Sequence, residues 1–96
     1  MIRHTVVFTL KHEAGSPEER DFLESARQLA GIATVEKFEQ LRQVSPKCDH
    51  AFGFSMEFAD QAAYDFYNDH PLHRDFVENR WMREVADFQE IDYQPL

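Results

Sequence analysis

Two of the five histidines stand at positions where apolar side chains are expected. His4 lies on the apolar face of the alternating segment from Ile2 to Lys11, and His73 lies on the apolar side of a helical pattern. A buried imidazole needs a hydrogen-bond partner or water, because an unpaired polar group in an apolar layer is costly. If both rings meet Tyr67 at one pocket, the three form an acid-base set. A neutral histidine would take a proton from carbon next to a carbonyl while the tyrosine hydroxyl stabilises the oxyanion.

Aromatic residues supply walls for such a pocket, since nine Phe, three Tyr and one Trp are many for 96 residues. We expect Phe52, Phe54 and Trp81 to line the pocket, together with His70. A purely structural interpretation stays open. His70 can bond the backbone groups freed beside Pro71, and the two buried histidines and the aromatic rings can be satisfied inside a packed core.

Residue spacing argues against metal and cofactor chemistry. His70 and His73 flank a helix start, and the sequence has neither a Cys pair nor an HExxH motif, so no dedicated metal site is predicted. The three glycines are isolated and form no phosphate-binding loop, so no nucleotide cofactor is expected. The lone Cys48 lies beside Asp49, whose carboxylate disfavours a reactive thiolate.

Composition narrows the partners and the compartment. A net charge of -8 repels a phosphate backbone, so nucleic acid is not expected as a partner. One cysteine can form no internal disulfide, which favours a reducing compartment. The chain enters a strand pattern directly rather than through a signal peptide, and no apolar run approaches the ~20 residues of a membrane-spanning helix. These features predict a cytoplasmic protein with no membrane partner.

Four strands and two helical segments must position this chemistry. The first helix is marked at both ends, since Ser16 and Glu19 form a capping box and Gly31 is placed to end it. The second helical segment begins at Asp60 and is interrupted by a histidine-proline pair. The strands are predicted at Ile2–Lys11, Val35–Val44, Ala51–Phe58 and Phe88–Tyr93, the second of them at a sheet edge.

The order strand, helix, strand, strand, helix, strand is that of the ferredoxin-like α+β fold, here as a single domain over residues 1–96. Such a fold has a four-stranded antiparallel sheet with helices on one face only. The other face of the first strand carries Thr5, Val7 and Thr9, which suit a subunit interface better than open water. We therefore expect a homodimer in which a second copy covers the bare face.

Four segments carry a family resemblance. They are the opening Ile2–Phe8, the strand Phe54–Phe58 leading to Asp60, the His70-Pro71-Leu72-His73 motif followed by Phe76-Val77, and the closing Ile91-Asp92-Tyr93. In their order and spacing they resemble the stress-responsive A/B barrel (Dabb) family over nearly the whole chain. The resemblance implies that two subunits press their sheets face to face into a dimeric α+β barrel.

Known members of that family include stress-induced proteins of unsettled biochemistry and the plant olivetolic acid cyclase, which closes a ring without a cofactor. The resemblance places His4, Tyr67 and His73 at three positions that surround the substrate pocket of the cyclase, and so implies catalytic roles for them. A further pocket histidine of the cyclase aligns with Phe52, which separates this chain from that substrate and reaction.

Three functions are compatible with the sequence. The first is a dimeric Dabb protein that binds a small hydrophobic or aromatic molecule between sheet and helices, with His4, Tyr67 and His73 as polar lining. The second is a cofactor-independent cyclase, isomerase or related oxygenase that uses these side chains for acid-base catalysis. The third is a structural stress protein whose pocket is filled by its own side chains. All three share one fold, so the space beside His4 must decide.

Overall fold

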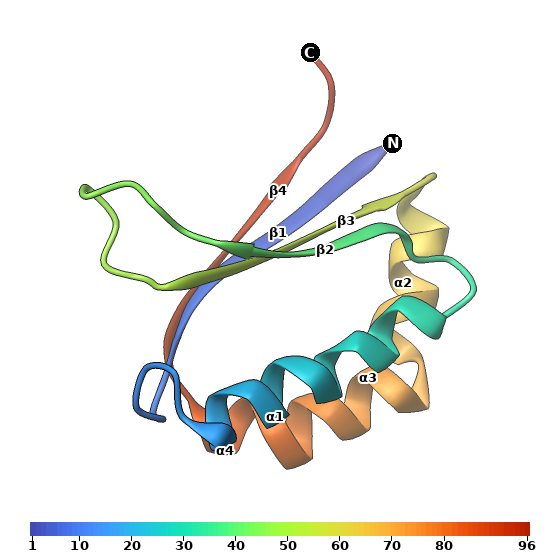
Figure 1. Ribbon diagram of the computed structural model, residues 1–96. Coiled ribbons are helices and arrows are strands. Elements are labelled where there is room, and N and C mark those ends of the chain that lie inside the picture. The colour runs from blue at the N-terminus through green and yellow to red at the C-terminus, as the bar shows by residue number, and fades with distance from the viewer.

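The computed structural model describes residues 1–96 and has every helix on one face of a four-stranded antiparallel sheet (Figure 1). The strands are β1 Ile2–Leu10, β2 Glu36–Arg42, β3 Phe52–Phe58 and β4 Val85–Tyr93, in the spatial order β2-β3-β1-β4. The helical segments are α1 Pro17–Ala26, the 3-10 helix η1 Arg27–Gly31, α2 Gln61–Asp69, α3 Pro71–Phe76, the π-helical turn η2 Val77–Trp81 and α4 Met82–Glu84. The ferredoxin-like α+β fold predicted from the sequence is confirmed.

Alternation along β1 decides which side chains reach the helices. The residues that face the helical layer, Ile2, His4, Val6, Phe8 and Leu10, are all buried. Antiparallel register places Phe54 of β3 on one side of Val6 and Glu90 of β4 on the other. Cross-strand partners point to the same face. The helix-facing surface of the sheet is therefore built jointly by these three strands.

Aromatic rings fill the layer between sheet and helices near Phe8, which is fully buried. The ring centroids of Phe54 and Trp81 lie 4.7 and 4.9 Å from that of Phe8. Phe22 of α1 reaches the same ring at 5.9 Å. Each such pair contributes about 0.5–1.5 kcal/mol beyond simple burial. This cluster fixes α1 and η2 onto the sheet.

The first helix begins where its capping residues predict. The hydroxyl of Ser16 accepts a hydrogen bond from the N–H of Glu19 at 3.2 Å, and the Glu19 carboxylate accepts one from the N–H of Gly15 at 3.1 Å. The helical segment ends at Gly31 as predicted, although its last turn is the 3-10 helix η1 and Gly31 does not take a left-handed conformation. A tighter last turn satisfies terminal carbonyls without such a glycine.

The second helical segment breaks at the predicted histidine-proline pair. The Asp60 carboxylate caps α2 by accepting from the N–H of Ala63 at 2.8 Å. His70 has extended backbone, and its Nδ1 accepts from the N–H of Leu72 at 3.1 Å, so this histidine caps α3. None of the helices has the length and apolar composition needed to cross a bilayer.

One detail of the predicted elements needs correction. The last strand begins at Val85 rather than Phe88, because Val85 already pairs with Leu10 across an irregular register. The hydrophobic residues Phe66 of α2 and Leu72 of α3 are 49% and 37% exposed. The prediction of β2 as an edge strand is confirmed.

Candidate functional site

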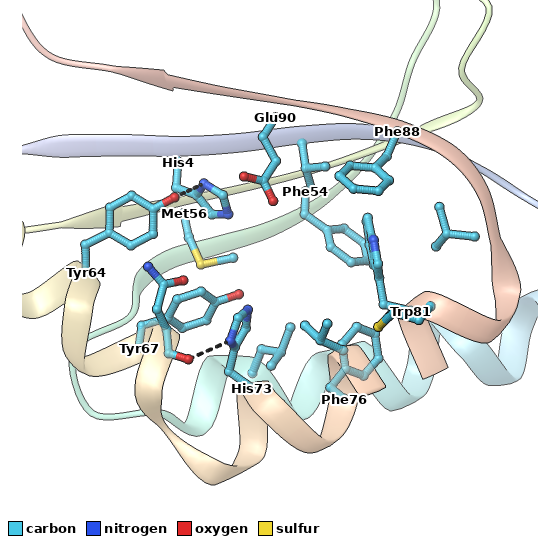
Figure 2. A pocket seen from close by; sticks show the side chains of 16 residues that line it. His4, Phe54, Met56, Tyr64, Tyr67, His73, Phe76, Trp81, Phe88 and Glu90 are labelled. Carbon is cyan, nitrogen blue, oxygen red and sulfur yellow. Dashed lines mark hydrogen bonds between the residues drawn. The ribbon is translucent and has the colours of Figure 1, made fainter. Parts of the chain in front are cut away.

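A cavity of about 550 Å³ lies beside His4, between the sheet and the helices (Figure 2). Twelve of its sixteen lining residues are hydrophobic. Strands β1, β3 and β4 form one wall, and η1, α2, α3, η2 and α4 form the other. The volume falls within the ~300–1,000 Å³ typical of small-molecule sites. At β4 the lining residues Phe88 and Glu90 are exposed, so the cavity opens to solvent along that edge.

The cavity has a polar end and an aromatic end, as Figure 2 shows. The polar end is formed by His4, Tyr64, Tyr67, Asn68 and His73. The aromatic end is formed by Phe54, Phe76, Trp81 and Phe88, with the Phe88 ring edge-on to Trp81 at 5.5 Å. This division suits a molecule with an apolar body and one polar group.

His4 is held at the polar end by a side chain directly across the sheet. Its Nδ1 lies 2.6 Å from Oδ1 of Asp92, its cross-strand partner on β4, and 2.9 Å from the hydroxyl of Tyr64. A carboxylate can only accept, so the hydrogen of the neutral ring resides on Nδ1. The lone pair of Nε2 is then free to act as a hydrogen-bond or proton acceptor.

Tyr64 completes this network, because its hydroxyl donates to Oδ2 of Asp92 at 2.9 Å. Burial and the adjacent carboxylate raise the pKa of Tyr64 above its ordinary value, so the hydroxyl keeps its proton. Its ring stacks on Phe58 with centroids 4.8 Å apart. The three polar groups therefore form one fixed unit, of which His4 and Tyr64 line the cavity and Asp92 lies behind them.

His73 rises from α3 into the polar end (Figure 2). Its Nδ1 donates to the backbone carbonyl of Asn68 at 3.1 Å, which leaves Nε2 as the acceptor of the neutral ring. Burial lowers the pKa of His73 below the ordinary 6.5, against the opposing effect of the Asn68 hydrogen bond. The ring is therefore neutral and able to accept a proton at pH near 7.

Tyr67 lies between the two histidines. Its ring centroid is 4.3 Å from that of His73 and 6.2 Å from that of His4. The hydroxyl forms no hydrogen bond within the chain, yet no fully buried side-chain oxygen or nitrogen lacks a partner, so this oxygen borders the open cavity. Burial, with a smaller effect of Glu90, raises the pKa of Tyr67. The hydroxyl is thus a protonated donor facing the space that a ligand would fill.

Two of the three aromatic residues expected to line the cavity do so. Phe54 and Trp81 line the cavity, whereas Phe52 does not. Phe52 lies at the other end of β3, where its ring packs 5.8 Å from Phe8 and under the guanidinium of Arg42 at 5.3 Å. The Phe8 cluster therefore separates Phe52 from the polar end.

His70 also lies outside the cavity, in contrast to the expectation. Its Nδ1 is occupied as the cap of α3, and its ring packs edge-on against the exposed Phe66 at 5.7 Å. The residue before a proline takes extended backbone, which directs this imidazole away from its neighbour His73. The structural interpretation of His70 is the one that its contacts favour.

Four polar side chains of the site were not identified from the sequence: Tyr64, Asn68, Glu90 and Asp92. Tyr64 could have been identified, because the helical pattern places it on the apolar side of α2. Phe88, Glu90 and Asp92 are spaced two residues apart along β4, so their side chains lie on one face of the sheet. Which residue of β1 each would meet depends on the strand register, and the sequence alone does not specify that register. No three His, Cys, Asp or Glu side chains are grouped so that they could hold a metal ion.

Comparison with known proteins places this architecture in a family. The model of the stress-responsive A/B barrel domain matches residues 2–95. A crystal structure of a Dabb family protein with a ferredoxin-like fold from Mesorhizobium loti is 64% identical, with 99% of this chain and 96% of that chain covered and a TM-score of 0.98. No protein with a curated function matches the sequence.

More distant structures share the fold alone. A dimeric ferredoxin-like protein of unknown function from Thermobifida fusca is 18% identical, with 98% of this chain and 90% of that chain covered and a TM-score of 0.78. The hydroxynitrile lyase from Passiflora edulis is 13% identical, with 96% of this chain and 90% of the lyase covered and a TM-score of 0.80. The fold is therefore found both in an enzyme and in a protein without a known activity.

Proposed function

The chain belongs to the stress-responsive A/B barrel (Dabb) family, and we propose that it is one subunit of a homodimer that binds a small, partly apolar molecule between sheet and helices. The observation that carries this proposal is the open cavity of about 550 Å³, with its polar groups gathered at one end and its aromatic rings at the other. Protein interiors contain few voids larger than a water molecule. A cavity of this size argues against a purely structural protein whose own side chains fill the layer.

The bare face of the sheet supports the dimer. Leu41, Ile91 and Tyr93 on that face are 46%, 39% and 52% exposed. Register brings Leu41 beside Gly53 and Gly53 beside Val7, so the apolar residues form a band across the strands. A second copy would cover this band and add buried surface to a small domain. The Thermobifida fusca protein with the same fold is itself dimeric.

Light scattering at micromolar concentration tests the assembly. A dimer has twice the 11.4 kDa mass of the chain. A single species of 11.4 kDa would contradict the homodimer.

Ligand binding can be followed through Trp81, which is the only tryptophan and lines the cavity. We expect 2-acetonaphthone, an aromatic ketone, to change Trp81 fluorescence in a saturable manner. Val6→Phe narrows the cavity and should weaken binding by roughly tenfold or more. Val44→Phe is the matched control, because Val44 is 82% exposed and lies outside the cavity. Equal affinity in both variants would contradict binding at this site.

A second candidate is a cofactor-independent acid-base enzyme, and the joint position of Tyr67 and His73 favours it. Nε2 of His73 would take a proton from carbon next to a carbonyl, and the electrons of that C–H bond would move to the carbonyl oxygen. The Tyr67 hydroxyl would donate a hydrogen bond to the resulting enolate oxygen. His4, fixed by Asp92, would accept a hydrogen bond from the ligand at its free Nε2. Return of the proton to carbon completes an isomerisation cycle.

Exchange of the methyl protons of 2-acetonaphthone in D2O measures this chemistry without knowledge of the natural substrate. The wild-type protein should accelerate exchange above buffer, and His73→Ala should slow it by about 10²–10⁴-fold while ligand affinity is kept. His70→Ser retains a capping side chain for α3 and should exchange at the wild-type rate. Exchange at the buffer rate with all three proteins would remove this activity for aryl ketones and leave the binding proposal to the fluorescence titration.

A further inference from the structure

Glu90 is a carboxylate at the mouth of the cavity that nothing in the chain neutralises. It lies on β4 as the cross-strand partner of Val6, and its side chain extends from the strand beside His4 (Figure 2). It forms no hydrogen bond or ion pair within the chain, and no Lys or Arg lines the cavity. A ligand in the cavity would therefore meet this negative charge without a compensating cation.

The charge of Glu90 reaches the groups at the polar end. It raises the pKa of the Tyr67 hydroxyl and works against the lowering of the pKa of His73 by burial. Both histidines donate from Nδ1, His4 to Asp92 and His73 to the Asn68 carbonyl, so Nε2 is the acceptor atom of either ring in its neutral form. Two histidine nitrogens and the Glu90 carboxylate therefore lie near two donors that have no partner in the chain, the hydroxyl of Tyr67 and the side-chain amide of Asn68.

We propose that Glu90 is a specificity residue that excludes carboxylate ligands and favours an uncharged aromatic carbonyl compound carrying a hydrogen-bond donor, such as a primary amide or a hydroxyl group. The inference rests on the proposed ligand pocket and names the class of molecule that it takes. A ligand carboxylate at the polar end would approach a like charge in a partly desolvated site. An amide N–H or a hydroxyl would instead donate to Glu90 or to a histidine Nε2, while its carbonyl or hydroxyl oxygen accepts from Tyr67.

The pair 2-naphthamide and 2-naphthoate tests this selection, because the two molecules share a ring system and differ in charge. Their affinities are measured by Trp81 fluorescence at neutral pH and low salt. The wild type should bind the amide roughly tenfold or more tightly than the acid. Glu90→Gln should reduce that ratio by a similar factor. Glu78→Gln removes the same charge from an exposed position outside the cavity and should leave the ratio unchanged.

The outcomes separate the selection from the binding proposal. If both probes bind and Glu90→Gln leaves their affinity ratio at the wild-type value, Glu90 does not select and the pocket stands. If neither probe binds the wild type or Glu90→Gln, both the pocket and the selection are overturned. A ratio that falls in Glu90→Gln and also with added salt in the wild type supports selection by charge. Circular dichroism of each variant confirms that the fold is retained.

Discussion

Removing the hydroxyl of Tyr64 tests whether His4, Asp92 and Tyr64 act as one unit. Tyr64→Phe deletes the donor to Asp92 at 2.9 Å. A hydrogen bond to a charged group contributes about 1.5–3 kcal/mol, and the low end applies here because water can replace the hydroxyl. That replacement is possible because the Asp92 side chain is 40% exposed. Asp92→Ala removes the same bond and also the acceptor of the buried His4 Nδ1, which raises its expected cost to about 2–3 kcal/mol.

The double variant should cost less than the sum of the two single changes. Both single variants lose the Tyr64–Asp92 bond, so this bond is counted twice in the sum and the coupling should be about 1.5 kcal/mol. Urea unfolding followed by Trp81 fluorescence measures all four free energies, at one fixed protein concentration because the stability of a dimer depends on it.

The control is Asp75→Ala, which removes an exposed carboxylate from α3, on the helical side of the protein and away from the proposed dimer face. Asp75 forms no hydrogen bond or ion pair through its side chain, so its loss should change the free energy of unfolding by less than about 0.5 kcal/mol. Strict additivity of Tyr64→Phe and Asp92→Ala would refute the network. The nitrogen NMR signals of His4 provide a second readout, because they show which ring nitrogen carries the hydrogen. A neutral ring with its hydrogen on Nε2 instead of Nδ1 in the wild type would contradict the network.

Three further predictions follow from single residues. Because burial lowers the pKa of His73 in the folded state, the unfolded chain binds more protons below about pH 6.5 and stability should fall with pH there; urea unfolding from neutral pH to about pH 5 should show a smaller loss in His73→Gln than in the wild type. Val7→Glu places a charge at the centre of the bare face and should yield an 11.4 kDa monomer by light scattering, whereas a persistent dimer would place the interface elsewhere. Gly15 has a φ of +77°, so Gly15→Ala should destabilise the fold by about 1 kcal/mol in thermal unfolding, and an unchanged midpoint would be inconsistent with that backbone conformation.

Local chemistry explains what the sequence predicts well. The Ser16 cap, the Asp60 cap and the extended backbone before Pro71 depend on neighbouring residues, and all three occur as predicted. The alternation along β1 likewise assigns His4 to the helical layer, because side chains in a strand alternate strictly between faces.

Features that depend on tertiary contact are the ones the sequence does not specify. The pairing of His4 with Asp92 requires the register of β1 on β4, which is set by the whole sheet. The exclusion of Phe52 from the cavity depends on its distance from the polar end along β3. In the sequence, Glu90 is typical of a solvated surface residue. Only the tertiary structure, in which the cavity opens along β4, places its side chain where it could contact a ligand.

The central claim is that His4 and His73 face one cavity that holds a small, partly apolar molecule. The imidazole proton signals of the five histidines can be followed by NMR during titration with 2-naphthamide. We predict saturable shifts for His4 and His73 together, with unchanged signals for His12, His50 and His70, which lie outside the cavity. Shifts confined to those three residues, or no shift of the two cavity histidines at saturating probe, would contradict the account.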